Sequence, residues 1–377
     1  MADVEPRPRR SRALPLPETV ALVLQGGGAL GSYQAGVVEA LSAAAIEPDW
    51  VAGISIGAVN AAIIAGNPPE RRVERLRGFW DQATSWLPSF PIPPDEMVRE
   101  FVHEWSAGFV AMAGVPGFFG PRFVSPFLAV PGSPGALSFY DATPLRATLD
   151  ELVDWDLAND GPVRLSVGAV DVESGNFRYF DSDEQRIDAR HVMASGALPP
   201  GLPPVEIDGR LYWDGGLVSN TPLQHVLDNQ REGMIVFQVD LFSAADERPR
   251  TIMDVMARAK EITFSSRTRQ VTDQVMRLRK ERELVRKVLA KLPDELRDDA
   301  DVVALGRMAA EQPVSLVHLI YRANTWEGGA RDFEFSTRTM REHWMAGRAA
   351  VEATMANADL VAENILTGRT AAFDLAR

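Results

Sequence analysis

A serine set between two glycines constrains the fold of this chain more than any other feature. The stretch Gly53-Ile54-Ser55-Ile56-Gly57 follows a short apolar run at 50–52 and precedes a helix-like run at 58–65. A serine that attacks a carbonyl stands on a tight turn from strand to helix, where glycines permit the strained backbone and the helix points its free N–H groups at the hydroxyl. The pattern predicts a nucleophile elbow with Gly53 and Gly57 as its close-packed positions. Because such a pattern also arises by chance, the rest of the chain has to support it.

Length and composition limit the architecture around this turn. A chain of 377 residues with 46% apolar and 24% charged residues fits one large domain plus an accessory region. We expect a flexible basic tail over 1–18, a main domain over 19–245 with an apolar, lid-like insertion at 86–139, and a mostly helical accessory region over 246–377. The absence of cysteine excludes disulfides, thiolate nucleophiles and cysteine-ligated metals, and it fits a cytoplasmic protein.

A glycine-rich loop lies upstream of the elbow. An apolar run at 20–24 predicts a buried strand, which leads through Gly26, Gly27, Gly28 and Gly31 into a helix. Backbone N–H groups at such a helix start can bind an anion. The spacing also fits a dinucleotide fingerprint, but that motif requires an acidic residue at the end of the second strand. Here the second strand ends in the serine elbow. An oxyanion hole is therefore favoured over a nucleotide site or a structural turn.

An Asp-Gly-Gly sequence supplies the third element. Asp214 ends a predicted aromatic strand at 211–213 and is followed by Gly215 and Gly216. Alone, this sequence would indicate an ordinary turn. A glycine loop, a serine elbow and an aspartate in this order indicate acyl-transfer chemistry instead.

These three elements resemble the motifs of the patatin-like phospholipase family, specifically a bacterial branch with a C-terminal extension. The resemblance covers about 20–242 and includes an Ala-Ser segment with the sequence MASGALP at 193–199, together with Asn220 and Pro222. Two positions depart from the family pattern: Gln25 stands where many members have Asp, and Leu30 where many have Arg or Lys.

The resemblance implies a three-layer α/β/α fold with a mainly parallel central sheet and a serine–aspartate dyad. Ser55 would be the nucleophile and Asp214 its base, because a carboxylate in a dry pocket can have a raised pKa. The oxyanion would be held by the N–H groups of Gly27 and Gly28, with contributions from Gly26 and Ile56. Such acyl hydrolysis of lipid esters needs no metal or organic cofactor.

The histidines offer an alternative base. His191 and His225 flank Asp214 in the sequence, and a Ser-Asp-His order would suit an ordinary α/β-hydrolase. That fold, however, separates its oxyanion loop and nucleophile by more residues than this chain does. We expect His103 and Glu104 to lie on the solvated face of an amphipathic helix.

One segment of the C-terminal region is basic, although the whole chain is acidic, with a net charge of −13. Long helices are predicted over 251–292, a strand over 314–321 and a terminal helix over 335–357. The segment 251–292 has eleven Lys or Arg against five Asp or Glu, so its helices could contact acidic partners or the anionic headgroups of a membrane or lipid granule. A charge run of this kind is more usually a solvated helical face. The acidic net charge argues against nucleic-acid binding. The second functional hypothesis is a lipid-surface or granule-binding protein with weak esterase activity.

Overall fold

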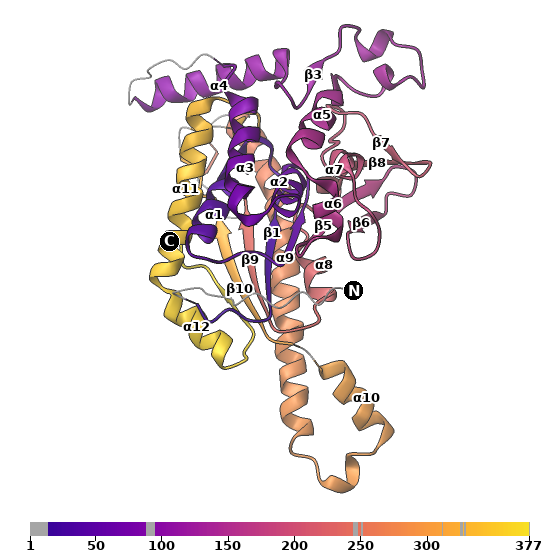
Figure 1. Cartoon of the computed structure of the whole chain (residues 1–377), viewed down its shortest axis with the longest axis vertical. Coiled ribbons are helices and arrows are strands. Elements are labelled where there is room, and N and C mark those ends of the chain that lie inside the picture. The colour runs from indigo at the N-terminus through magenta and orange to yellow at the C-terminus, as the bar shows by residue number, and fades with distance from the viewer. Residues whose placement is uncertain are drawn as a thin grey trace.

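The chain forms a central sheet whose strands are mostly parallel (Figure 1). The computed structural model describes residues 14–87, 95–243, 248–249, 252–310, 312–324, 327 and 329–376. In this part of the chain the sheet has nine strands, in the order β11-β10-β9-β1-β2-β5-β8-β7, with β6 paired to β5. The parallel strands are β1 (Thr19–Leu24), β2 (Trp50–Gly53), β5 (Arg164–Asp171), β9 (Met234–Asp240), β10 (Val314–Ile320) and β11 (Ala371–Phe373). The antiparallel strands are β6 (Phe177–Asp181), β7 (Val205–Ile207) and β8 (Arg210–Asp214).

The central strands are apolar along almost their whole length, since both faces of the sheet are covered. Val20, Leu22 and Leu24 of β1 pack into one core, and Ala21 and Val23 pack into another. A parallel sheet covered by helices on both faces requires such strands. The expected three-layer α/β/α fold is therefore confirmed, as are the strands predicted from these apolar runs.

The two helical layers draw on distant parts of the chain. One face of the sheet is covered mainly by α1 (Gly31–Ala43), α2 (Ile56–Ala65), α3 (Pro69–Thr84) and α11 (Thr337–Ala356), and the other by α8 (Leu223–Asp228) and α9 (Ile252–Leu289). Three helices lie near β5 and β8: α5 (Thr143–Leu152), α6 (Trp155–Asp160) and α7 (Ala189–Ser195). No helix within the described ranges is long and apolar enough to cross a membrane.

The C-terminal third is built into the same sheet. Beyond α9 the chain forms α10 (Ala300–Ala309), β10, α11, α12 (Ala358–Leu366) and β11. The predicted strand over 314–321 is confirmed as β10, which pairs in parallel with β9. The predicted terminal helix is α11, but it is not terminal, because α12 and β11 follow it. Residues 1–13 of the expected tail lie outside the described residues, and Leu14 is buried in the core.

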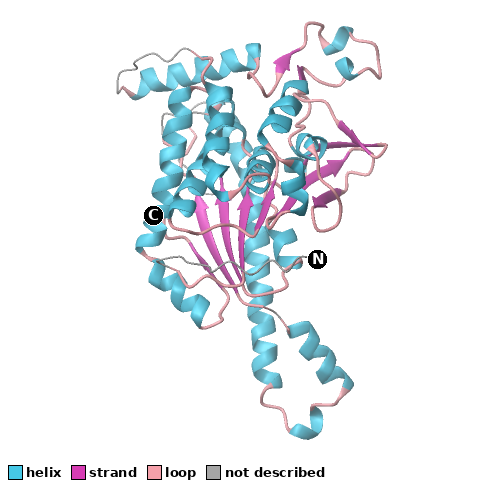
Figure 2. Ribbon diagram, in the orientation of Figure 1, coloured by secondary structure: helices cyan, strands magenta, loops and turns pink. Residues whose placement is uncertain are grey.

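The insertion at 86–139 contributes α4 (Glu96–Ala113) and a short hairpin of β3 (Gly120–Pro121) with β4 (Tyr140–Asp141). Figure 2 shows the parallel strands pointing toward the end of the molecule that carries this insertion. The α9–α10 hairpin projects from the opposite end.

Candidate active site

Ser55 stands on a strained turn between β2 and α2. Its φ of 55° and ψ of −124° lie in a region that non-glycine residues rarely adopt. The flanking glycines are required by space: a Cβ atom on Gly53 would lie 2.2 Å from the carbonyl oxygen of Gly57, and one on Gly57 would lie 2.3 Å from that of Leu24. The local sequence therefore produces a turn in which strand and helix pass in backbone contact.

The buried hydroxyl of Ser195 fixes this turn through two hydrogen bonds. It donates to the carbonyl oxygen of Gly168 at 2.7 Å and accepts from the backbone N–H of Ser55 at 3.0 Å. Ser195 is fully buried at the end of α7. Sequence analysis gave Ser195 no role, although it is the serine of the 193–199 segment.

Asp214 reaches Ser55 from the end of β8, which pairs with β5 so that Asp214 lies opposite Ala169. One oxygen of its carboxylate accepts from the N–H of Gly216 at 2.7 Å, and the Ser55 hydroxyl lies near enough to the carboxylate to lower its pKa. The side chain is 2% exposed. Burial raises the pKa of Asp214 to about 7, and the Gly216 N–H and the Ser55 hydroxyl oppose this rise only in part.

Both glycines after Asp214 are closely packed, each against a different neighbour. A Cβ atom on Gly215 would lie 2.6 Å from the carbonyl oxygen of Gly168, and one on Gly216 would lie 3.0 Å from Oδ1 of Asn220. The structure thus brings the two predicted dyad residues together through tight backbone packing around Gly168.

The carbonyl groups of the glycine loop are fixed by amide side chains. Gln34 donates to the carbonyl oxygen of Gln25 at 2.7 Å, and Asn220 donates to that of Gly26 at 2.9 Å. A trans peptide directs its C=O and N–H to opposite sides. The bond from Asn220 therefore turns the N–H of Gly27 away from Asn220.

In the loop and the elbow, the N–H groups of Gly27, Gly28 and Ile56 have no acceptor among the described residues. The N–H of Gly26 differs, because it donates to the carbonyl oxygen of Asn220 at 3.2 Å. Gly26 thus contributes close packing, since a Cβ atom there would lie 2.9 Å from that of Ser55. Gly28 has a φ of 55°, and the backbone of the C-terminal region passes close to it: a Cβ atom on Gly28 would lie 2.2 Å from the carbonyl oxygen of Asp332.

Gln25 connects this loop to three other segments. Its side-chain oxygen accepts from the N–H groups of Leu241 and Phe242 at 2.6 and 3.1 Å. Its side-chain nitrogen donates to the hydroxyls of Thr221 and Thr268 at 3.1 and 3.2 Å. Acceptor and donor are both used, which an aspartate at this position could not reproduce. The departure from the family pattern thus coincides with a contact to α9.

The histidines considered as alternative bases have other partners. His225 lies 2.9 Å from the carboxylate of Asp181, which also binds Arg164, and His191 caps α7 through Asp188. Among the described contacts, neither histidine touches Ser55 or Asp214. The expectation for His103 was wrong: it is buried and hydrogen-bonded to Thr339. In the part of the chain that the structure describes, no group of acidic or histidine side chains is arranged to hold a metal.

Fold and site together define an α/β protein with a serine elbow, a buried aspartate and a glycine-loop anion site. A family model described as patatin-like phospholipase matches residues 22–227, and one described as patatin phospholipase matches residues 262–364. The chain belongs to the patatin-like phospholipase family.

Curated relatives include two fungal enzymes. Lysophospholipase nte1 of Aspergillus terreus is 25% identical over 243 residues, covering 63% of this chain and 13% of the relative. Lysophospholipase NTE1 of Candida glabrata is 25% identical over 237 residues, covering 62% of this chain and 11% of the relative. The matched part of the chain thus spans only a small fraction of these relatives.

Among solved structures, VipD from Legionella pneumophila matches with a TM-score of 0.34 and 16% identity, covering 87% of this chain and 67% of that one. Human GIVD cytosolic phospholipase A2 matches with a TM-score of 0.33 and 13% identity, covering 59% of this chain and 43% of that one.

Proposed function

We propose that this protein is a serine acyl hydrolase that cleaves acyl esters of lipids through a dyad of Ser55 and Asp214. The observation that carries the proposal is a serine on a strained turn beside a buried carboxylate, whose pKa burial raises to about 7 and the serine hydroxyl lowers in part. Family membership supports lipid esters as the substrate class, and the names of the fungal relatives point to lysophospholipids.

The chemistry follows from these positions. Asp214 accepts the proton of Ser55 as the serine oxygen bonds to the ester carbonyl carbon, and the developing oxyanion faces the N–H groups of Gly27, Gly28 and Ile56. One such donor contributes about 3 kcal/mol to transition-state stabilisation. When the ester bond breaks, Asp214 returns the proton to the leaving alcohol. Water then attacks the acyl-serine and gives its proton to Asp214, which returns that proton to the serine oxygen as the acyl–serine bond breaks and the fatty acid leaves.

The position of Asp214 explains how the dyad works without histidine. An exposed aspartate is a weak base at neutral pH because its pKa is near 3.9. Burial raises the pKa of Asp214 to about 7, which brings its basicity close to the working pH.

The test is covalent labelling of the purified full chain with a fluorophosphonate, combined with hydrolysis of lysophosphatidylcholine. Ser55→Ala should abolish both, and Asp214→Asn should slow both by roughly 10²–10⁴-fold. Ser85→Ala, at an exposed serine after α3, and Asp208→Asn, at the exposed turn between β7 and β8, are matched controls that should retain activity.

The competing hypothesis is a lipid-binding protein with weak esterase activity. It would be favoured by vesicle binding without probe labelling, or by equal labelling of the wild type and Ser55→Ala. Either result would overturn the dyad proposal.

A further inference from the structure

Helix α4 is amphipathic, but its apolar side faces the solvent. Val98, Phe101, Trp105, Phe109 and Met112 recur every three or four residues and are all exposed, with Met112 at 79%. The buried side of the helix holds Ala107 and Val110 together with the polar residues His103 and Ser106. A surface helix of a soluble domain normally turns its largest apolar side chains toward the core, but here they face the solvent.

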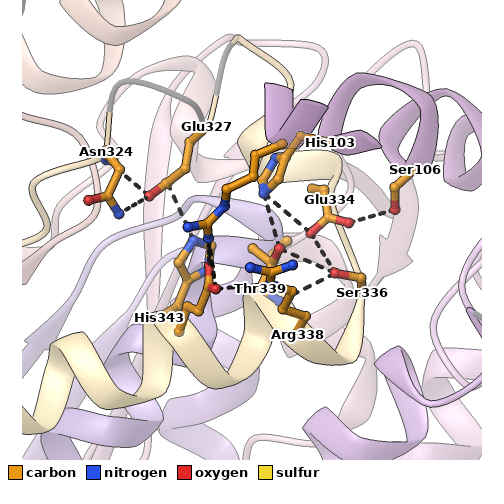
Figure 3. A network of polar contacts seen from close by, with 12 residues as sticks. His103, Ser106, Asn324, Glu327, Glu334, Ser336, Arg338, Thr339 and His343 are labelled. Carbon is orange, nitrogen blue, oxygen red and sulfur yellow. Dashed lines mark hydrogen bonds and ion pairs between the residues drawn. The ribbon is translucent and has the colours of Figure 1, made fainter. Parts of the chain in front are cut away.

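Specific polar contacts hold the helix in this orientation (Figure 3). The hydroxyl of Ser106 donates to Glu334 at 2.5 Å, and a ring nitrogen of His103 lies 3.0 Å from the hydroxyl of Thr339. Arg99 adds an ion pair to Glu342 at 2.8 Å. Because the Ser106–Glu334 and His103–Thr339 pairs are buried, exposure of the apolar stripe is a built feature of the fold.

The apolar surface continues beyond the helix. Seven large apolar residues of the following segment are exposed: Phe123, Val124, Phe127, Leu128, Val130, Leu137 and Phe139. We call these residues and the apolar stripe of α4 the apolar cap. Arg122 is the only charged residue between Trp105 and Tyr140. Isolated exposed apolar residues are ordinary, but a set of this size marks an interaction surface.

The apolar cap lies at the catalytic end of the molecule. In Figures 1 and 2, α4 and the segment around β3 lie beyond the carboxyl ends of the parallel strands. The glycine loop follows β1 at this end, and Ser55 follows β2. A substrate that arrives through the apolar cap therefore reaches the side of the sheet that carries the site.

The cationic surface lies elsewhere. A groove of about 610 Å³ between α8 and α9 is lined by Arg231, Arg279, Arg282 and Arg286 together with Asp228. Arg231 and the neighbouring Gln312 immediately precede β9 and β10, so this groove opens at the amino ends of the strands. A membrane held by these arginines would face the end of the sheet opposite Ser55.

We propose that the apolar cap docks the protein on a lipid surface whose headgroups carry no net charge. Trp and Phe side chains favour the boundary between lipid headgroups and acyl chains, and the near absence of charge on 106–139 suits a neutral surface better than an anionic one. The inference rests on the proposed function only in that the lipid surface supplies the acyl ester.

Flotation of the full chain with vesicles of phosphatidylcholine tests docking directly. The double variant Phe101→Ser/Phe127→Ser removes two exposed aromatic rings from the apolar cap and should weaken vesicle binding by at least about tenfold. The matched control, Leu284→Ser/Val288→Ser, changes two exposed apolar residues near the far end of α9 and should bind like the wild type. Binding should change little with salt.

A soluble p-nitrophenyl ester separates docking from catalysis, because its hydrolysis should be equal in the wild type and the Phe101→Ser/Phe127→Ser variant. If the wild type floats with vesicles but neither it nor the variants hydrolyse the soluble ester, the proposed function is overturned and docking remains supported. Three results would overturn docking: unchanged flotation of the double variant, binding that requires anionic lipid and disappears in salt, or a dimer that the double variant dissociates without any vesicle binding.

Discussion

At the scale of single residues, the site depends on keeping one carboxylate out of water. The burial that makes Asp214 a useful base also makes its ionisation unfavourable, since the pKa of about 7 lies well above the ordinary value near 3.9. Activity and stability should therefore respond to pH in opposite directions over the same range.

Activity should rise with pH as Asp214 loses its proton. We expect kcat/KM for a soluble ester to increase through an apparent pKa of about 7 and to fall about tenfold for each pH unit below it, because only the carboxylate accepts the serine proton. A pH–rate profile from pH 5 to 9 measures this. A profile that is flat between pH 5 and 8 would show that a different group limits the reaction.

Stability should show the reverse trend. The folded state holds the Asp214 proton more tightly than the unfolded chain, so the cost of the buried charge is absent below about pH 4, grows as pH rises toward 7, and is complete above it. Asp214→Asn should therefore be more stable than the wild type at pH 8, by roughly 2 kcal/mol, and the difference should shrink at pH 4.5. Denaturant unfolding of both proteins at the two pH values checks the sign.

The residues that sequence analysis could identify belong to short continuous motifs. Ser55 and Asp214 lie in the patterns Gly-x-Ser-x-Gly and Asp-Gly-Gly, which can be read from neighbouring positions although some contacts that require the glycines are distant. Ser195 and Gln25 act through partners far away in the sequence, so their neighbours in the sequence do not indicate these contacts. His103 was misjudged for the same reason, because its partner Thr339 lies 236 positions away.

At the scale of elements, α9 is joined to the glycine loop by one side chain. Gln25 donates to Thr268 of α9, and the hydroxyl of Thr268 also lies 2.7 Å from that of Thr221, which closes a buried triangle of polar groups. The C-terminal region thereby supports the loop that would bind the oxyanion through this contact, and the carbonyl oxygen of Asp332 packs closely against Gly28.

Removing the α9 contact should slow the chemical step. Thr268→Val keeps the shape of the side chain but leaves the Gln25 amide with one partner fewer, so we expect kcat to fall about threefold to tenfold while KM changes little. Thr272→Val is the matched control. Thr272 is equally buried one turn along α9, and its hydroxyl donates to the carbonyl oxygen of Thr268. Equal losses in both variants would mean that helix stability, and not the contact to Gln25, is responsible.

At the scale of the whole molecule, the first and last thirds of the chain form one packed layer. Helices α1 and α11 cross in backbone contact: a Cβ atom on Gly36 would lie 1.9 Å from the carbonyl oxygen of Trp344, and one on Gly347 would lie 2.1 Å from that of Tyr33. Such a crossing requires glycine on both helices. It links the helix after the glycine loop directly to the C-terminal region, although the sequence alone suggested an accessory unit after residue 245.

A methyl group placed at this crossing should destabilise the entire protein. Gly347→Ala would force α1 and α11 apart, so we expect the free energy of unfolding to fall by about 1–3 kcal/mol despite the better helix propensity of alanine. Gly306→Ala on α10 is the matched control, since its nearest neighbour would be 4.0 Å away. That variant should gain up to about 1 kcal/mol. Urea unfolding followed by fluorescence measures both changes. If each variant shows a single transition, shifted in opposite directions in the two variants, the N- and C-terminal regions unfold together. Two transitions, with only the later one shifted by Gly347→Ala, would instead indicate a separable C-terminal unit.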